Sequence, residues 1–237
     1  MPTVLRPTAP IAADVVLPGD PGRALALAQE LLVAPRMSNH AHGLWGYSGE
    51  TAEGDALTIQ STGVGAPSAA LVLGDLAEAG VTRAVRVGTC VALGDEVDLH
   101  STLLCERALA VDGTSRALGA AEAAEPDRGL TDALAALPGA PAVRRTVVTA
   151  DVIHGDGDGG GVPADLREHW LAGGAVAAEM QVAALFAAGS QRGVKVAALL
   201  VVADGADGRE GDSSRLDEAA SAAGALAARA LRDEGAR

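Results

Sequence analysis

Short apolar runs alternate with longer stretches rich in Ala and Leu along most of the chain, and few folds accept such a pattern. The runs lie at 15–17, 57–59, 84–87, 101–105, 146–149 and 196–202. Most of them are continuously apolar, which is typical of strands covered on both faces. The stretches between them have helical spacing, at 23–32, 68–79, 128–137, 177–191 and 214–232. The pattern predicts an α/β fold with a mainly parallel or mixed sheet between helical layers. No linker or fixed repeat divides the chain, so we expect a single domain over residues 1–237.

The composition narrows the functional class. Hydrophobic residues make up 49% of the chain and charged residues 21%, which is typical of globular domains. The net charge of −13 argues against a nucleic-acid partner, because phosphate backbones require clustered Lys and Arg. There is no apolar run near the ~20 residues of a membrane span, and no charged-then-apolar leader. We therefore expect a cytoplasmic protein without a membrane partner.

The cysteines and aromatic residues add two smaller constraints. Cys90 and Cys105 both lie in apolar stretches, which favours buried free thiols over a disulfide or a catalytic thiol. Aromatic residues make up only 2% of the chain, so few rings are present to stack on a base or a sugar.

Two glycine-containing junctions join an apolar run to a helical stretch. The first, at 17–23, includes Gly19 and Arg23 and could bring backbone N–H groups and a helix N-terminus to an anion. The second, at 61–68, offers Ser68 as a helix N-cap. Either junction alone is equally well explained as a tight turn. Their repetition indicates a polar ligand lying across several strand ends.

Four polar positions stand out in apolar surroundings. Arg86 interrupts a run otherwise suited to a buried strand, and its guanidinium predicts either an oxyanion ligand or a buried salt bridge. Glu179 and Gln181 open an apolar helical stretch, where they face a polar cavity or the exposed start of the helix. Asp204 ends the most apolar run, where a carboxyl could act as a general acid. After it, the spacing Ser214-x-x-Asp217 predicts a capping box.

The segment 154–161 is too rich in glycine to be regular. Its alternating aspartates could hold calcium, but the spacing and closing Glu of an EF-hand are missing. A mobile surface loop is the favoured interpretation, and we expect no metal site.

Taken together, these segments resemble the nucleoside phosphorylase family, which includes hexameric bacterial purine nucleoside phosphorylases and uridine phosphorylases. The matching segments occur in the family's order between about residues 15 and 231. They are Leu17-Pro-Gly-Asp-Pro-Gly-Arg23, Gly46-Tyr-Ser-Gly49, the 61–68 junction, Arg86-Val-Gly-Thr89, Glu179-Met180 and the strand ending at Asp204. The resemblance implies a three-layer α/β/α fold with a mixed, partly barrel-like central sheet. It also implies a homo-oligomer, from dimer to hexamer, with sites shared across the dimer interface.

The resemblance further implies reversible phosphorolysis of a nucleoside to a free base and a pentose 1-phosphate. Inorganic phosphate is then a co-substrate, and no metal or organic cofactor is needed. Asp204 matches the residue that protonates the purine N7, and Arg215 the arginine that assists it. The other matched positions are Gly19, Arg23, Arg86, Thr89 and His42 for phosphate, Glu179, Met180 and Gln181 for ribose, and Ile153 and His154 for the base.

Several positions depart from the family pattern. Gln181 stands where the family has a carboxylate that accepts the ribose hydroxyls, and His42 stands where a neighbouring subunit lends an arginine to phosphate. Ile153 and His154 replace the aromatic pair that flanks the base, and Val91 replaces a glycine. The Gln-x-Arg pair of uridine phosphorylases is missing after Thr149, which favours a purine.

Three functions therefore remain open. A phosphorylase with an altered ribose site is favoured. A non-catalytic nucleoside- or phosphate-binding relative is motivated by Gln181 and His42. A hydrolytic nucleosidase is disfavoured by Arg23 and Arg86, because those enzymes lack the phosphate arginines.

Overall fold

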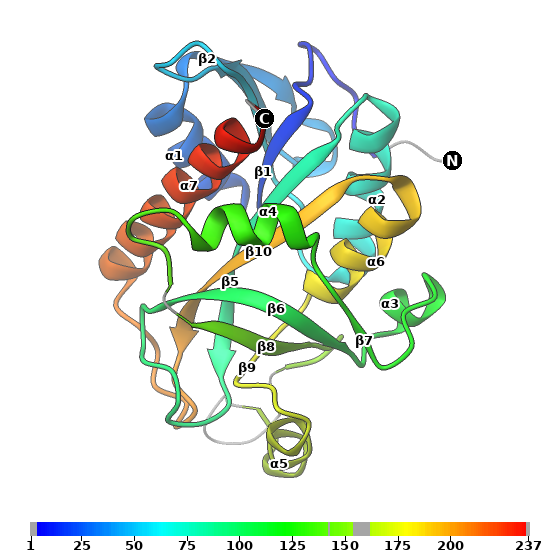
Figure 1. Cartoon of the computed structure of the whole chain (residues 1–237), viewed down its shortest axis with the longest axis vertical. Helices are drawn as coiled ribbons and strands as arrows, with labels where there is room; N and C mark the ends of the chain where they lie inside the picture. The colour runs from blue at the N-terminus through cyan, green and yellow to red at the C-terminus, as the bar shows by residue number, and fades with distance from the viewer. Residues whose placement is uncertain (1–3, 142, 154–161, 236–237) are drawn as a thin grey trace.

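The computed structural model describes residues 4–141, 143–153 and 162–235, and it has the expected α/β architecture (Figure 1). The strands are β1 (Asp14–Pro18), β2 (Val33–Asn39), β3 (Gly46–Glu50), β4 (Ala56–Gln60), β5 (Arg83–Ala92), β6 (Thr102–Ala110), β7 (Ala123–Ala124), β8 (Arg144–Thr149), β9 (Ala177–Glu179) and β10 (Lys195–Asp204). The helices are α1 (Pro21–Leu31), α2 (Ala66–Glu78), α3 (Gly113–Ala117), α4 (Arg128–Ala135), α5 (Ala164–Ala172), α6 (Val182–Arg192) and α7 (Ser213–Gly235), with a 3-10 turn at Ala41–Gly43.

The mixed sheet closes on itself in part. β5 pairs with β10 on one side and with β9 on the other, and β9, β8, β6 and β10 pair in turn, so these strands form a closed ring. β1, β4, β3 and β2 extend from β5 as an open sheet. The neighbours β4, β1, β5 and β10 are all parallel. Their carboxyl ends therefore meet at one edge.

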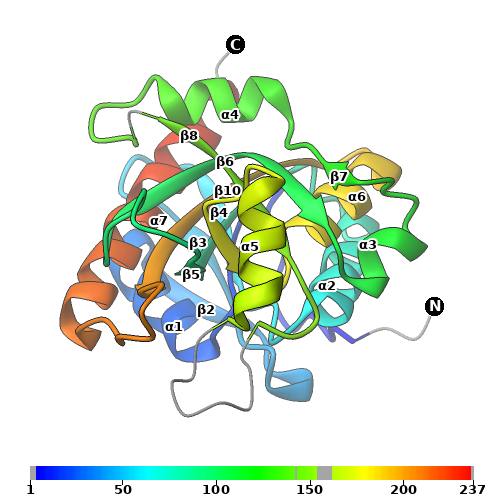
Figure 2. The same ribbon diagram turned by 90° about the horizontal axis from the view of Figure 1, so that it is seen from below.

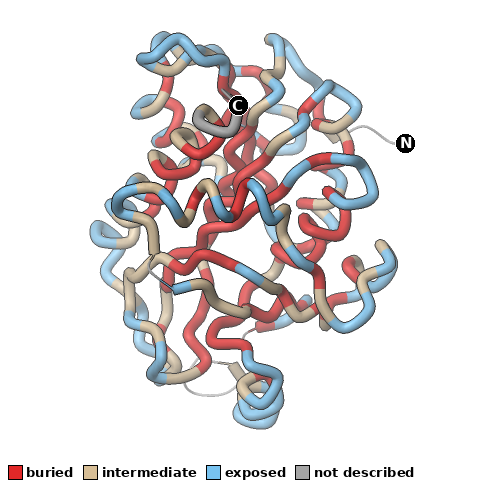
Figure 3. The backbone as a smooth tube through the Cα atoms, viewed as in Figure 1, coloured by how far each residue is buried: buried red, intermediate tan, exposed pale blue. Residues whose placement is uncertain are grey.

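Helices cover both faces of this sheet (Figure 1). α1, α4 and α7 pack on one face through a core that includes Leu27, Leu134 and Ala227. α2 and α6 pack on the other face, through a core that includes Leu73 and Leu185. The central strands are buried along most of their length, and exposed residues lie at the periphery (Figure 3). The predicted three layers and partly barrel-like sheet are thus confirmed.

A third, smaller core packs α5 against the ring of strands. α5 lies in front of these strands in Figure 2. The members of this core include Leu93, Val148, Ile153 and Trp170. Because Ile153 belongs to this core, the chain is anchored directly before segment 154–161. That segment, with His154 and the predicted glycine-rich loop, lies outside the described residues.

Three local predictions are wrong. Segment 177–191 is not one helix: its start forms β9 between β5 and β8, where Ala177 and Ala178 are fully buried, and α6 begins only at Val182. Strand pairing overrides the helical preference of alanine there. Ser68 does not cap α2, because the helix begins at Ala66 after Gly65, and the Ser68 hydroxyl donates to the Thr62 carbonyl. The Ser214–Asp217 capping box does not form either. Asp212 accepts from the Arg215 N–H at 3.0 Å in its place.

Other sequence predictions can be compared directly with the structure. Cys90 and Cys105 are buried free thiols, as expected. In the described part of the chain, no helix is long and apolar enough to cross a membrane. The same residues contain no group of three or more His, Cys, Asp or Glu side chains that could hold a metal ion.

Candidate active site

A cavity of about 400 Å³ opens at the carboxyl ends of β1, β4, β5 and β10, the edge at which parallel α/β sheets bind ligands. Its volume is within the usual range for small-molecule sites. Residues from widely separated segments line it: Gly19, Asp20, Pro21, Arg23, Gly63, Val64, Gly65, Arg86, Thr89, Cys90, Val91, Ile153, Glu179, Met180, Gln181, Ala203 and Asp204.

The N-terminus of α1 forms one wall of this cavity. Asp20 caps the helix by accepting the Arg23 N–H at 2.8 Å, and Pro21 occupies the first turn, where no N–H is needed. Gly19 precedes the cap, and a Cβ added there would lie 3.3 Å from Arg86 Nη1. The glycine therefore lets the guanidinium approach the helix start, so that a positive dipole and two arginines face the same space.

Arg86 is the most buried cation of the site, with only 6% of its surface exposed. Its Nη1 donates to the Leu17 carbonyl at 3.2 Å and to Thr62 Oγ1 at 3.4 Å, while its Nε has no hydrogen-bond partner. Burial lowers the pKa of Arg86 to about 10; Glu179 opposes this shift and Arg23 adds to it. A buried cation with unused donors is suited to an anionic ligand.

Glu179 is the buried anion of the site, with 2% exposure. Its carboxylate accepts the Thr149 hydroxyl and the N–H groups of Gln181 at 2.7 Å and Val182 at 2.8 Å. Burial raises the pKa of Glu179, and Arg86 and these hydrogen bonds oppose the increase. Glu179 thus fixes the start of α6 and compensates the charge of Arg86 in part.

Gln181 is also 2% exposed, and its side chain turns toward the loop after β4. Its Oε1 accepts from Thr62 Oγ1 at 2.8 Å. Its Nε2 donates to the carbonyls of Gly63 at 2.8 Å and Gly65 at 3.2 Å. The amide therefore joins the start of α6 to this loop.

The structure brings together most of the residues selected from the sequence. Gly19, Arg23, Arg86, Thr89, Ile153, Glu179, Met180, Gln181 and Asp204 all line the cavity. His42 does not: it is exposed in the 3-10 turn, with φ of 56°. Arg215 does not line it either, and is exposed in the first turn of α7.

Cys90 and Ala203 also line the cavity, and neither was selected from the sequence as a site residue. Both are small residues in strands, and only the pairing of β5 with β10 reveals which of their faces meets the cavity. Burial raises the pKa of the Cys90 thiol, and Glu179 and Asp204 add to the increase. The raised pKa keeps the thiol protonated near neutral pH, which argues against a nucleophilic role.

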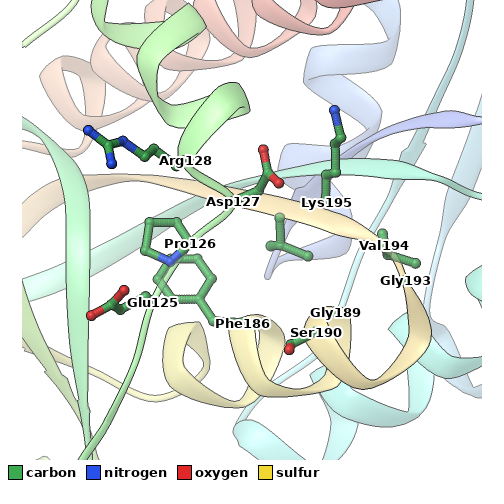
Figure 4. A pocket seen from close by; sticks show the side chains of 11 residues that line it. Glu125, Pro126, Asp127, Arg128, Phe186, Gly189, Ser190, Gly193, Val194 and Lys195 are labelled. Carbon is green, nitrogen blue, oxygen red and sulfur yellow. The ribbon is translucent and has the colours of Figure 1, made fainter.

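A second cavity, of about 380 Å³, lies at the other end of β10 (Figure 4). It is bounded by the start of α4 and the end of α6. The charged side chains of Glu125, Arg128 and Lys195 diverge there instead of converging on one point (Figure 4). Of the matched family segments, only the strand that ends at Asp204 reaches this cavity, through Lys195 and Val196 at its opposite end. We assign the cavity no role in the reaction.

Comparisons with known proteins show the family and the fold of the chain. A DeoD-type purine nucleoside phosphorylase of Clostridium novyi is 30% identical over 206 residues, which cover 82% of this chain and 83% of the relative. The corresponding protein of Oceanobacillus iheyensis is 36% identical over 99 residues, covering 41% and 42%. The crystal structure of uridine phosphorylase from Vibrio fischeri superimposes with a TM-score of 0.84 at 23% identity, over 98% of this chain and 97% of that one.

The family model described as the phosphorylase superfamily matches residues 14–232. This range includes every residue that lines the cavity. The chain therefore belongs to the phosphorylase superfamily.

Proposed function

We propose that this protein is a nucleoside phosphorylase, a pentosyltransferase that converts a nucleoside and inorganic phosphate into a free base and a pentose 1-phosphate. One observation carries the proposal: Arg23, Arg86 and the N-terminus of α1 line the same cavity as Asp204. The two arginines and the helix N-terminus suit a dianion, and the Asp204 carboxyl suits proton transfer. The relationship to DeoD-type purine nucleoside phosphorylases supports the same activity.

In the proposed reaction, Arg23, Arg86 and Thr89 hold phosphate below C1′ of the sugar. A phosphate oxygen forms a bond to C1′ while the bond from C1′ to the base nitrogen breaks, and the electron pair leaves with the base. Asp204 protonates the leaving base, at N7 when the base is a purine. Holding both reactants in one cavity supplies much of the rate enhancement by proximity. Phosphate is the only co-substrate, and the reaction requires no metal or organic cofactor.

A purine is the favoured base. Asp204 lies in the cavity with Ile153 and Val91, so one carboxyl and two aliphatic side chains face the space proposed for the base. The Gln-x-Arg pair expected for a pyrimidine is missing after Thr149 in the sequence. The Ile153 and Val91 side chains offer apolar contact without aromatic stacking.

We also propose that the enzyme works as a homo-oligomer. His42 is exposed outside the cavity of its own chain. It is therefore available to the phosphate site of a neighbouring subunit, as the resemblance implies. Nearby exposed apolar side chains, Met37 at 44% and Trp45 at 36% exposure, fit a subunit contact on that side.

The test is base release from purine and pyrimidine ribonucleosides, measured with and without phosphate. We expect release only with phosphate, and faster release from purine nucleosides. Release that is indifferent to phosphate identifies a nucleosidase. Phosphate binding without release from any nucleoside identifies a non-catalytic relative, and either result contradicts the proposal.

A further inference from the structure

His100 lies in the connection between β5 and β6, beside the end of β10 that carries Asp204. We propose that His100 is a positioning residue for Asp204, because it holds the β-bulge that brings Asp204 to the cavity. The proposal rests on the proposed function for the role of Asp204 as the acid that protonates the leaving base. The contacts of His100 belong to the protein alone.

β10 carries a bulge directly before Asp204. Val202 pairs with Cys90 of β5, and the next pair is Asp204 with Val91. Ala203 is therefore an extra residue in the ladder. Consecutive residues of a regular strand face opposite sides of the sheet, but Ala203 and Asp204 both line the cavity. The bulge thus redirects the end of the strand, and the place of Asp204 depends on it.

Two hydrogen bonds hold the carbonyl groups of the bulge, and His100 contributes to both. Its N–H donates to the Val202 carbonyl at 2.8 Å, and the Gly211 N–H donates to the Ala203 carbonyl at 2.8 Å. The His100 ring lies against Gly211, where an added Cβ would be 2.8 Å from Nε2 and 2.6 Å from the Ala203 oxygen. His100 therefore contacts the bulge through its backbone and supports, through its ring, the glycine that closes it.

The segment after Asp204 returns to the bulge as a tight turn. The Gly205 N–H donates to the Arg209 carbonyl at 2.9 Å. Asp204 itself forms an antiparallel bridge with Glu210, the residue before Gly211. A displacement of Gly211 would therefore reach Asp204 both through this bridge and through the carbonyl of Ala203.

His100 is held in a conformation that costs free energy. Its φ is 66°, in the left-handed region that residues other than glycine rarely adopt. Both of its ring nitrogens are buried, and neither has a hydrogen-bond partner among the described residues. An imidazole carries at least one N–H donor, so its burial without a partner is unfavourable. Strained backbone and unsatisfied buried polar groups are concentrated at functional sites, and the end of β10 is such a place.

Misplacement of Asp204 should impair one step of the reaction. Arg86 is held by Leu17 and Thr62, away from the bulge, so phosphate binding does not depend on His100. Only the proton transfer to the leaving base does. A purine that is methylated at N7 already carries a positive charge, and it leaves as a neutral base without receiving a proton. Comparison of a purine nucleoside with its N7-methyl form therefore separates loss of the acid from general damage to the fold.

The first variant is His100→Gly, which removes the ring and relieves the left-handed backbone. We expect kcat/KM for a purine ribonucleoside to fall at least about tenfold, because the acid is misplaced. Cleavage of the N7-methyl form and phosphate affinity by calorimetry should change less than about twofold. The Gly211 N–H should exchange with solvent at least about tenfold faster, as measured by NMR.

Gly211→Ala disturbs the same contact from the other side, because the new Cβ meets both the Ala203 oxygen and the His100 ring. It should cause the same selective loss on the unmethylated nucleoside. Since both variants act through one bulge, the double variant should lose less than the product of the single effects.

Ala34→Gly is the matched control for the backbone. Ala34 also has a positive φ, of 48°, but it is exposed on β2 and does not line the cavity. This variant should leave the cleavage of both nucleosides and the exchange of the Gly211 N–H unchanged.

Losses in His100→Gly that are absent, or equal on the two nucleosides, overturn the proposal, because the ring then serves the fold alone. Unchanged exchange of the Gly211 N–H overturns it as well. Wild-type protein that cleaves neither nucleoside contradicts the proposed function instead, and the exchange of Gly211 still decides whether His100 holds the bulge.

Discussion

Arg86 is a buried cation whose charge the protein compensates only in part, and an anionic ligand would complete the compensation. A guanidinium buried to 6% exposure in a strand loses much of its hydration, and a single anion, Glu179, compensates only in part. Bound phosphate adds a second anion and occupies donors that the protein leaves unused. The sequence already indicated this residue, because it is the charge within an apolar run.

Replacing Arg86 by lysine tests whether the Arg86 guanidinium binds phosphate. The Arg86→Lys variant keeps the charge but loses the planar pair of donors, so we expect KM for phosphate to rise about 10- to 100-fold. Arg83→Lys is the control, because Arg83 lies at the other end of the same strand, paired with Asp14. An unchanged KM for phosphate in Arg86→Lys would show that Arg86 is only a structural cation.

The pKa of Arg86 predicts a pH limit for phosphate binding. Because burial lowers this pKa to about 10, Arg86 is protonated below that value and loses its charge as the pH rises through it. Phosphate affinity should therefore be steady from pH 8 to about 9.5, then fall by about tenfold per unit above pH 10. Calorimetry across this range checks the prediction, and affinity that is flat up to pH 11 contradicts it.

At the scale of elements, the N-terminus of α1 contributes to the anion site only if it is correctly capped. Asp20→Ala removes the acceptor of the Arg23 N–H and should cost about 1 kcal/mol of stability, and should also weaken phosphate binding several-fold. Asp127 caps α4 in the same way, through the Leu130 N–H at 2.8 Å, and does not line the cavity. Asp127→Ala should thus lower the stability measured by urea unfolding to a similar extent, with no change in phosphate affinity. Equal phosphate affinities in the two variants would contradict the role of α1.

Strand β5 has to accommodate the guanidinium, and Gly88 makes this possible. A Cβ on Gly88 would lie 2.8 Å from Leu200 Cδ2 and 2.9 Å from Arg86 Cζ. Gly88→Ala should therefore destabilise the fold by about 1–3 kcal/mol and displace Arg86, with a loss of phosphate binding. Gly94→Ala, whose Cβ would approach Leu171 at 3.6 Å, should be tolerated. Thermal unfolding and phosphate calorimetry on both variants provide the check, and a Gly88→Ala variant with normal phosphate affinity contradicts it.

Some strands of the sheet could be predicted from the sequence, and others could not. Continuous apolar runs identified the parallel strands of the sheet, because such strands are apolar on both faces. The same reasoning failed at β9, where two alanines are held in a strand by their neighbours and not by their own preference. The same contrast holds for the residues that line the cavity. Arg86 and Asp204 stood out locally, whereas the orientation of Gln181 depends on carbonyls more than a hundred residues away.

At the scale of the molecule, the closed ring and the open sheet meet at β5, and the cavity lies at that junction. The ring supplies Glu179 and Asp204, and the open sheet supplies the loops after β1 and β4. This division explains why the site residues are spread over the whole sequence. A single domain over residues 1–237 and a cytoplasmic location stay predictions.

The central claim is that phosphate, and not water, attacks the sugar. The most direct measurement is to run the reaction in H₂¹⁸O with unlabelled phosphate and to analyse the sugar product by mass spectrometry. We predict a pentose 1-phosphate without ¹⁸O at C1, because the oxygen on that carbon comes from phosphate. A free pentose formed in place of the pentose 1-phosphate would contradict the account, because it would mean that water is the nucleophile.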